Sequence, residues 1–186
     1  MNAASNASST ALQLFTGTSA ATPNAAGAVS LLRNFIRGSN FEVDPGQINA
    51  LIINAGRLAN SSPYDQDNGA GFVTLPTNGH IWWGAVTAAT TSGSVVNVPI
   101  TLSGVSTQSL TATIWWPESI GGTHNDVDLY ILRPDGSVAV SSTTTSSVFE
   151  KAQVTSGSVV NGTYTVQIKS YNVPNAQQVY YAISFQ

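Results

Sequence analysis

The chain of 186 residues contains no cysteine. Neither a disulfide framework nor a thiolate metal site is therefore possible. Charge is also scarce, because Asp, Glu, Lys and Arg make up only 8% of the residues, against about 25% in an average soluble domain. The net charge is -3 and there is no basic cluster. We therefore expect neither nucleic acid nor a membrane surface as a partner.

Long apolar runs are missing as well. No run approaches the roughly 18 residues that a membrane-spanning helix needs, and residues 1–10 lack the basic end and the apolar stretch of a signal peptide. What the chain does contain is 42% apolar residues, enough for the core of one ordinary domain or of two small ones. Ser, Thr, Asn and Gly are abundant, which predicts a neutral, hydroxyl-rich surface.

The most informative stretch places Ser19 where a loop becomes an apolar helix rich in small residues. Apolar positions recur at helical spacing and predict a helix from about Ser19 to Arg37, with Pro23 in its first turn and Gly38 as its C-terminal stop. Small residues on the opposite side predict that this helix is buried all round. The first N–H groups of a helix lack intrahelical partners, so an oxyanion forming beside Ser19 would meet hydrogen-bond donors.

The sequence Gly-Thr-Ser-Ala-Ala-Thr-Pro at 17–23, followed by Ala-Gly at 26–27, resembles the nucleophile motif of the subtilisin-like serine peptidases. The resemblance implies that Ser19 attacks the peptide carbonyl and that its backbone N–H donates to the oxyanion. It also implies that Gly17 and Thr18 shape the substrate cleft. The alternative is that Ser19 is only a helix N-cap. Asn24 stands where many members have a histidine that is not the general base.

The catalytic partners of that serine are absent from this stretch. A serine hydroxyl needs a histidine to take its proton and a carboxylate to orient the histidine, and in this family both precede the serine, as does the oxyanion asparagine. Residues 1–18 contain no Asp, Glu or His. His80 and His124 follow the serine, in the wrong order for the family, and we interpret each as a solvated loop histidine.

The resemblance therefore implies the C-terminal part of a secreted serine endopeptidase that acts on polypeptide substrates. The missing N-terminal part of the catalytic domain would supply Asp and His, and a signal peptide would lie upstream. We expect residues 1–186 alone to be inactive.

A second helix is predicted after residue 43. Asp44 supplies an N-cap, Pro45 the first helical position and Gln47 the third, and the helix should end near Asn54 to Gly56. A short strand at Gly69–Val73 then resembles the one that closes peptidase domains of this family. We place the end of this catalytic segment at residue 80.

From about Trp82 the pattern changes to short alternating stretches separated by turns, which predicts a β-sandwich. Residues 125–136 and 161–166 resemble the jelly-roll-like accessory domains of the prepeptidase C-terminal type. The fold class is therefore mixed: an incomplete α/β subtilisin-like segment over 1–80, then an all-β accessory domain over 81–186. The predicted strands are Val95–Leu102, Ser109–Trp116, Val127–Leu132, Ser137–Ser141, Tyr164–Ser170 and Val179–Phe185.

Two acids alternate along one of these strands, so Asp126 and Asp128 should share a face. They could help to hold Ca²⁺ with Glu118, Asn125 or Asp135, or they could form the polar outside of a half-buried strand. No dense ligand loop with regular spacing is present. We predict no cofactor, and structural calcium stays open as the alternative.

Aromatic residues occur in adjacent pairs at Trp82-Trp83, Trp115-Trp116 and Tyr180-Tyr181. Neighbouring side chains of a strand point to opposite faces, so each pair gives one ring to the core. The outer rings could form an exposed row that stacks on sugars, and the second hypothesis is a non-catalytic binding module for polysaccharide or protein. Packing inside the protein is the interpretation we favour.

Burial energy bears on the first helix. Exposing its apolar residues forfeits about 1.5–3 kcal/mol each, a sum comparable to the net stability of a whole domain, about 5–15 kcal/mol. We predict that the first eighty residues leave an apolar face uncovered or make the chain prone to aggregation.

Overall fold

The structure is a computed structural model that describes residues 2–4, 7–8, 10–39, 41–42, 44–58, 63–65, 67–75, 80–104 and 107–186. The chain divides into two compact units, Met1–Glu42 and Val43–Gln186. Within the described ranges, no helix combines the length and apolar character that crossing a membrane requires.

The first unit holds a short hairpin and one long helix. Strand β1 (Asn2–Ala4) pairs antiparallel with β2 (Leu12–Leu14), and α1 follows from Thr18 to Gly38. The predicted helix bounds are thus correct to one residue at each end. The helix closes at Ser39, whose N–H donates to the carbonyls of Phe35 and Ile36 at 3.1 Å.

Most of α1 is open to solvent. Its buried residues are Ala20, Leu32 and Ile36, whereas Leu31 is 63% and Phe35 52% exposed. The prediction of a helix buried all round is therefore wrong, because the described residues of the first unit form only a two-stranded hairpin besides α1. The predicted uncovered apolar face is confirmed.

The second unit begins with α2 (Pro45–Asn54). The Asp44 carboxylate accepts a hydrogen bond from the Gly46 N–H at 2.7 Å, and Pro45 occupies the first turn, where a missing N–H costs little. The predicted N-cap and both helix bounds are confirmed. In the described part of the chain, Gln47 Oε1 is buried without a hydrogen-bond partner, so this oxygen completes no capping box.

Eight strands of the second unit form two four-stranded antiparallel sheets, with orders β10-β7-β12-β5 and β6-β11-β8-β9. All six predicted strands are present, with bounds within two residues. The strands β5 and β10 were not predicted. The strands are β5 (His80–Ala88), β6 (Val95–Leu102), β7 (Leu110–Trp115), β8 (Asp126–Leu132), β9 (Val138–Ser142), β10 (Phe149–Val154), β11 (Gly162–Asn172) and β12 (Gln177–Phe185).

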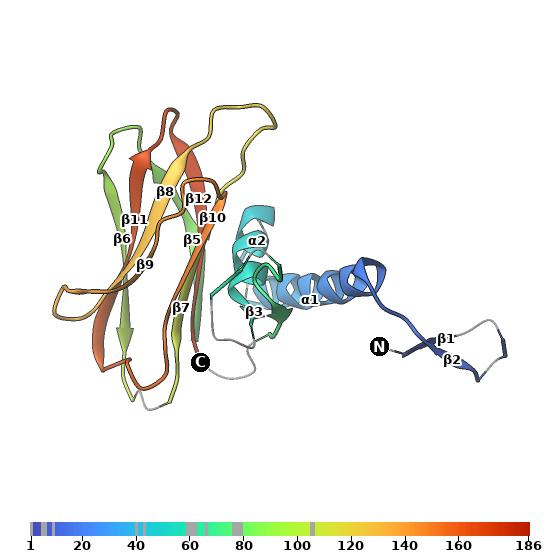
Figure 1. The fold of residues 1–186 in the computed structure, drawn as a ribbon. Helices are drawn as coiled ribbons and strands as arrows, with labels where there is room; N and C mark the ends of the chain where they lie inside the picture. The colour runs from blue at the N-terminus through green and yellow to red at the C-terminus, as the bar shows by residue number, and fades with distance from the viewer. Residues whose placement is uncertain are drawn as a thin grey trace. The chain divides into compact units, whose positions relative to one another are not determined.

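Figure 1 shows these two sheets stacked face to face. Apart from the β8–β9 hairpin, each connection from β5 to β12 crosses from one sheet to the other, which is the jelly-roll arrangement. A single apolar cluster fills the space between the sheets, with Trp116 and Tyr164 among its fully buried members. The predicted jelly-roll-like sandwich is therefore confirmed.

Helix α2 packs on the outer face of the sheet that contains β7 and β12. Ala112 and Ile114 of β7 point into the core, so Thr111 and Thr113 point outward. The side chain of Asn54, at the end of α2, donates to Thr111 O at 3.3 Å and to Thr113 Oγ1 at 3.3 Å. The helix is thus anchored to the sheet by a buried amide.

The compact units divide at Glu42/Val43, whereas the sequence predicts a domain boundary after residue 80. The difference arises because α2, together with the small pair β3 (Gly56–Arg57) and β4 (Phe72–Val73), belongs to the same compact unit as the sandwich. Spatial packing and the sequence resemblance thus divide the chain at different places.

Candidate functional site

Ser19 lies in the first turn of α1. Gly17 precedes the helix with a φ of 87°, a region that favours glycine. Its carbonyl accepts hydrogen bonds from the N–H groups of Ala20 at 3.0 Å and Ala21 at 3.1 Å. The N–H of Ser19 therefore precedes the first N–H that is bonded within the helix, at the positive end of the helix dipole.

This geometry excludes the alternative that Ser19 is the helix N-cap. Gly17 holds that position, and α1 has no side-chain cap hydrogen bond. Thr18 and Ser19 are both exposed, so the Ser19 hydroxyl is open to solvent. The residues predicted to form the nucleophile and its surroundings thus lie together at the exposed start of one helix.

Pro23 removes one helical hydrogen bond close to Ser19. The sequence predicts Pro23 in the first turn of this helix. Because α1 begins at Thr18, Pro23 instead lies in its second turn. A proline has no N–H, so the carbonyl of Ser19, four residues earlier, receives no helical hydrogen bond from it. Asn24, one residue further on, donates from Nδ2 to Ala20 O at 2.9 Å.

The model of the subtilase family matches residues 1–73. We call residues 1–73 the subtilase segment, after the family whose model they match. The resemblance that we based on residues 17–27 is confirmed, and the match supports a serine peptidase as the origin of this segment. The roles of Ser19, Gly17 and Thr18 remain predictions.

The subtilase segment contains no histidine that could act as the general base. No Asp, Glu or His precedes Ser19, and both histidines belong to the second compact unit. His80 is the first residue of β5 and is exposed, with its ring 5.8 Å from that of Trp82. The turn-like sequence Thr77-Asn78-Gly79 just before His80 lies outside the described residues.

His124 lies in the loop before β8, as predicted, and its side chain is 35% exposed, but it also contacts Glu118. Its Nδ1 lies 2.9 Å from Glu118 Oε2, while its Nε2 is buried without a partner in the described part of the chain. Burial pushes the pKa of Glu118 upward, but hydrogen bonds from the Asn125 N–H, His124 and the Trp116 indole outweigh it and lower the pKa. The loop that ends at β8 is therefore folded back on a charged side chain.

The two acids of β8 are buried, at 6% exposed for Asp126 and 5% for Asp128. The interpretation of a polar outer strand face is therefore wrong. Burial raises the pKa of both carboxyl groups, and the neighbouring Asp126 charge raises that of Asp128 further. The described residues contain no group of three or more His, Asp or Glu side chains that could hold a metal ion.

The aromatic pairs pack within the second unit. Trp116 is fully buried, and Trp115 packs at 5.9 Å from Tyr180. Trp82 and Trp83 are half-buried. The packing interpretation is confirmed, since none of these tryptophans, all of them described, is exposed.

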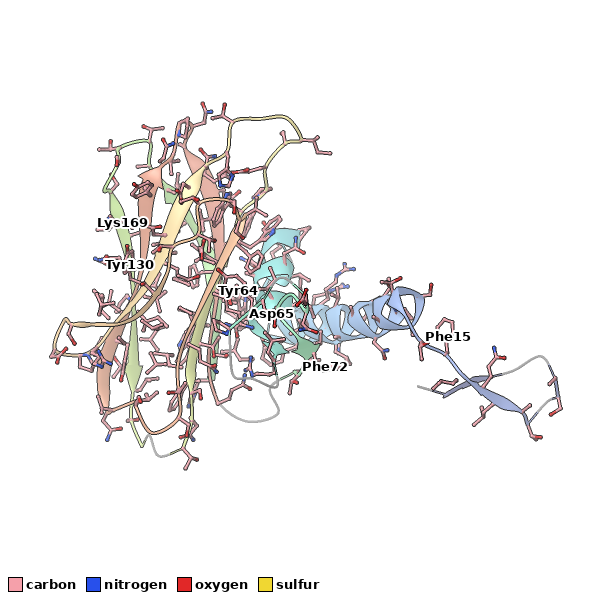
Figure 2. The ribbon with its side chains drawn as sticks, in the orientation of Figure 1. Phe15, Tyr64, Asp65, Phe72, Tyr130 and Lys169 are labelled. Carbon is pink, nitrogen blue, oxygen red and sulfur yellow. The ribbon has the colours of Figure 1, made fainter. Side chains whose placement is uncertain are left out.

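A lysine and a tyrosine ring face each other on the sheet that contains β8 and β11. Figure 2 labels Tyr130 of β8 and Lys169 of β11 on neighbouring strands, and the Lys169 Nζ lies 5.8 Å from the centre of the Tyr130 ring. Such contacts stabilise modestly at accessible sites. Both side chains are thereby engaged within the protein.

Solved structures with some similarity to the chain include PliG of Aeromonas hydrophila, a periplasmic inhibitor of g-type lysozyme. It is 12% identical, with a TM-score of 0.41, over 61% of this chain and 93% of that one. A mitogen derived from Yersinia pseudotuberculosis is 14% identical, with a TM-score of 0.41, over 57% and 86%. The carbohydrate-binding module CBM36, solved with calcium and xylotriose, is 15% identical, with a TM-score of 0.34, over 59% and 94%. Among curated proteins no match was found.

Proposed function

We propose that this chain supplies the nucleophile segment of a secreted serine endopeptidase of the subtilase family. Ser19 Oγ attacks the carbonyl carbon of a peptide bond, and a histidine from outside residues 1–186 takes the hydroxyl proton. That proton then goes to the leaving amine, and water hydrolyses the acyl-enzyme by the reverse sequence. The partners are therefore a polypeptide substrate and the rest of the catalytic domain.

One observation carries this proposal. An exposed serine lies in the first turn of α1, directly after a glycine with positive φ, and it does not cap the helix. The developing oxyanion would accept from the N–H of Ser19, which has no partner within the helix. Gly17 has no side chain and so leaves room for a substrate backbone beside Ser19.

The exposed apolar side chains of α1 support the same proposal. Leu31 and Phe35 lie four residues apart, on one side of the helix, and both are more than half exposed. A complete catalytic domain would cover such a face. We propose that the sandwich is an accessory domain and that the catalytic contribution of residues 1–186 lies in the subtilase segment.

The test is labelling by a fluorophosphonate probe, which reacts only with an activated serine. Residues 1–186 are compared alone and as part of a polypeptide that also carries the Asp- and His-bearing segment. We expect labelling only of the longer polypeptide, and its loss in Ser19→Ala. The matched control is Ser30→Ala, which removes another exposed hydroxyl of α1, one that donates to Ala26 O at 3.0 Å. Labelling that survives Ser19→Ala would overturn the assignment.

A further inference from the structure

Two cationic side chains converge on one carbonyl oxygen at the C-terminal end of α2. Lys151 Nζ, from β10, donates to Gly56 O at 2.8 Å and to Ile53 O at 2.8 Å. Arg57 Nη1 donates to the same Gly56 O at 2.8 Å and to Asn54 O at 2.7 Å. Because Lys151 Nζ and Arg57 Nη1 bond to the same oxygen, these two nitrogens lie no further apart than the sum of their two hydrogen-bond lengths.

Among the described residues, no carboxylate lies close enough to balance this pair. Neither Lys151 nor Arg57 has an acidic group within 4.0 Å among the described residues. The ion pair found among those residues joins His124 and Glu118 instead. The carbonyls at a helix C-terminus carry only about half a negative charge in total. Lys151 is 2% exposed, so water screens its charge poorly, and the pair retains a surplus of positive charge.

A cavity of about 240 Å³ opens beside the two cations. Its polar lining consists of Arg57, Lys151, Ser109, Gln153, Thr155 and Ser156. Ser109 Oγ accepts from the Ser156 N–H at 3.1 Å, so its own O–H stays available as a donor. Among the described residues, none that lines this cavity is acidic.

We propose that this cavity binds a small oxyanion. Lys151 has donated two of its three N–H groups to carbonyls, which leaves one for a ligand, and the other guanidinium nitrogens of Arg57 offer a planar fork suited to oxyanions. The ligand is either a free inorganic oxyanion or the terminal carboxylate of a peptide. The proposal stands on the second compact unit and is independent of Ser19.

Calorimetric titration of the full chain tests the proposal. The probes are inorganic phosphate, and acetyl-alanyl-alanine against its C-terminal amide, in buffer of constant ionic strength set with chloride. Saturable binding of phosphate identifies a site for free oxyanions, and binding of the peptide acid but not of its amide identifies a terminal carboxylate. Failure of both probes to bind beyond chloride overturns the proposal.

Matched arginine variants locate the binding. Arg57→Gln should weaken it about tenfold to a hundredfold, the effect of losing a hydrogen bond from a charged group. Arg133→Gln, which removes an arginine whose Nη1 donates to Val138 O away from the cavity, should leave it unchanged. Equal affinities of the two variants would contradict the site.

Folding of Arg57→Gln is checked by circular dichroism and by its unfolding midpoint. If this variant does not fold, Ser109→Ala decides, since it removes a donor at the cavity wall without removing a charge. We expect at least about threefold weaker binding from the loss of one neutral hydrogen bond. Unchanged affinity in a folded Ser109→Ala would then overturn the proposal.

Discussion

Gly46 of α2 lies against the ring of Tyr180 on β12, so closely that a methyl group at Gly46 would be 2.2 Å from Tyr180 Cε2. The hydroxyl of Tyr180 donates to Asp44 Oδ2 at 3.3 Å, one residue before the helix. This contact explains how a helix near the start of the second unit is fixed on a strand at its end.

The first prediction concerns this contact. Gly46→Ala should lower the free energy of unfolding by about 1–3 kcal/mol, because the added methyl group forces the helix away from the ring. Urea unfolding followed by circular dichroism measures the effect. The control is Gly27→Ala in α1, where nothing lies within 4 Å of the added methyl group and a gain of about 0.5–1 kcal/mol in helix stability is expected. Equal behaviour of the two variants would show that the contact does not hold α2.

The second prediction is a pH dependence set by Lys151. Burial lowers its pKa to about 8, and the nearby Arg57 charge adds to the effect. Because the unfolded chain binds this proton more tightly, stability should rise from about pH 8 to about pH 10.5, by at most about 3 kcal/mol. The rise should vanish in Lys151→Met. Unfolding midpoints measured at several pH values check this, and a fall in stability over that range in the wild type, but not in the variant, would contradict it.

The third prediction concerns Asp128. Its pKa is raised, first by burial and then by the Asp126 charge, so the native state binds the proton more tightly than the unfolded chain. Its contribution to stability should therefore be fully present below its ordinary pKa of 3.8 and should be lost as pH rises from there through the raised pKa. Asp128→Asn should raise the thermal midpoint at pH 7. It should also remove the fall in stability that the ionisation of Asp128 causes as pH rises from acid towards pH 7.

Thermal unfolding between pH 4 and pH 7 measures this effect. Asp67→Asn is the control, since Asp67 is exposed and its loss should change neither the midpoint nor the slope. A lower midpoint for Asp128→Asn at pH 7 would show that the charged form is stabilised in the native state.

The fourth prediction concerns the uncovered face of α1. Leu31→Gln combined with Phe35→Gln should reduce self-association, because it replaces two large exposed apolar side chains. Sedimentation and light scattering measure it, and the unfolding midpoint of the sandwich should move little. Arg33→Gln, an exposed polar exchange on the same helix, is the control. Aggregation equal to that of the wild type would show that another surface is responsible.

Local signals predicted much of the fold. The Asp44-Pro45 pair fixed the start of α2 because the cap and the proline act within one turn, and Val95–Leu102 matched β6 residue for residue. Strand β10 was not predicted. Glu150 and Lys151 are consecutive in this strand, and the structure buries both. Two consecutive charged residues break the alternation of polar and apolar residues by which a strand is predicted.

The same limit applies to the charged groups. Sequence spacing placed Asp126 and Asp128 on one face but could not tell whether that face was covered. It gave no indication that Arg57 and Lys151 meet, because the two residues lie far apart in the chain and come together only where α2 packs on the sheet.

By itself, the sequence determined the nucleophile-like motif around Ser19, the N-cap of α2 and the sandwich class of residues 81–186. These follow from residue types within a few positions of one another. The tertiary structure alone decided which charges are buried, which side of α1 lies open and how the second unit gathers α2 onto its sheet. Those features depend on long-range packing, since the free energy of a side chain in a fold is set by the neighbours that cover it.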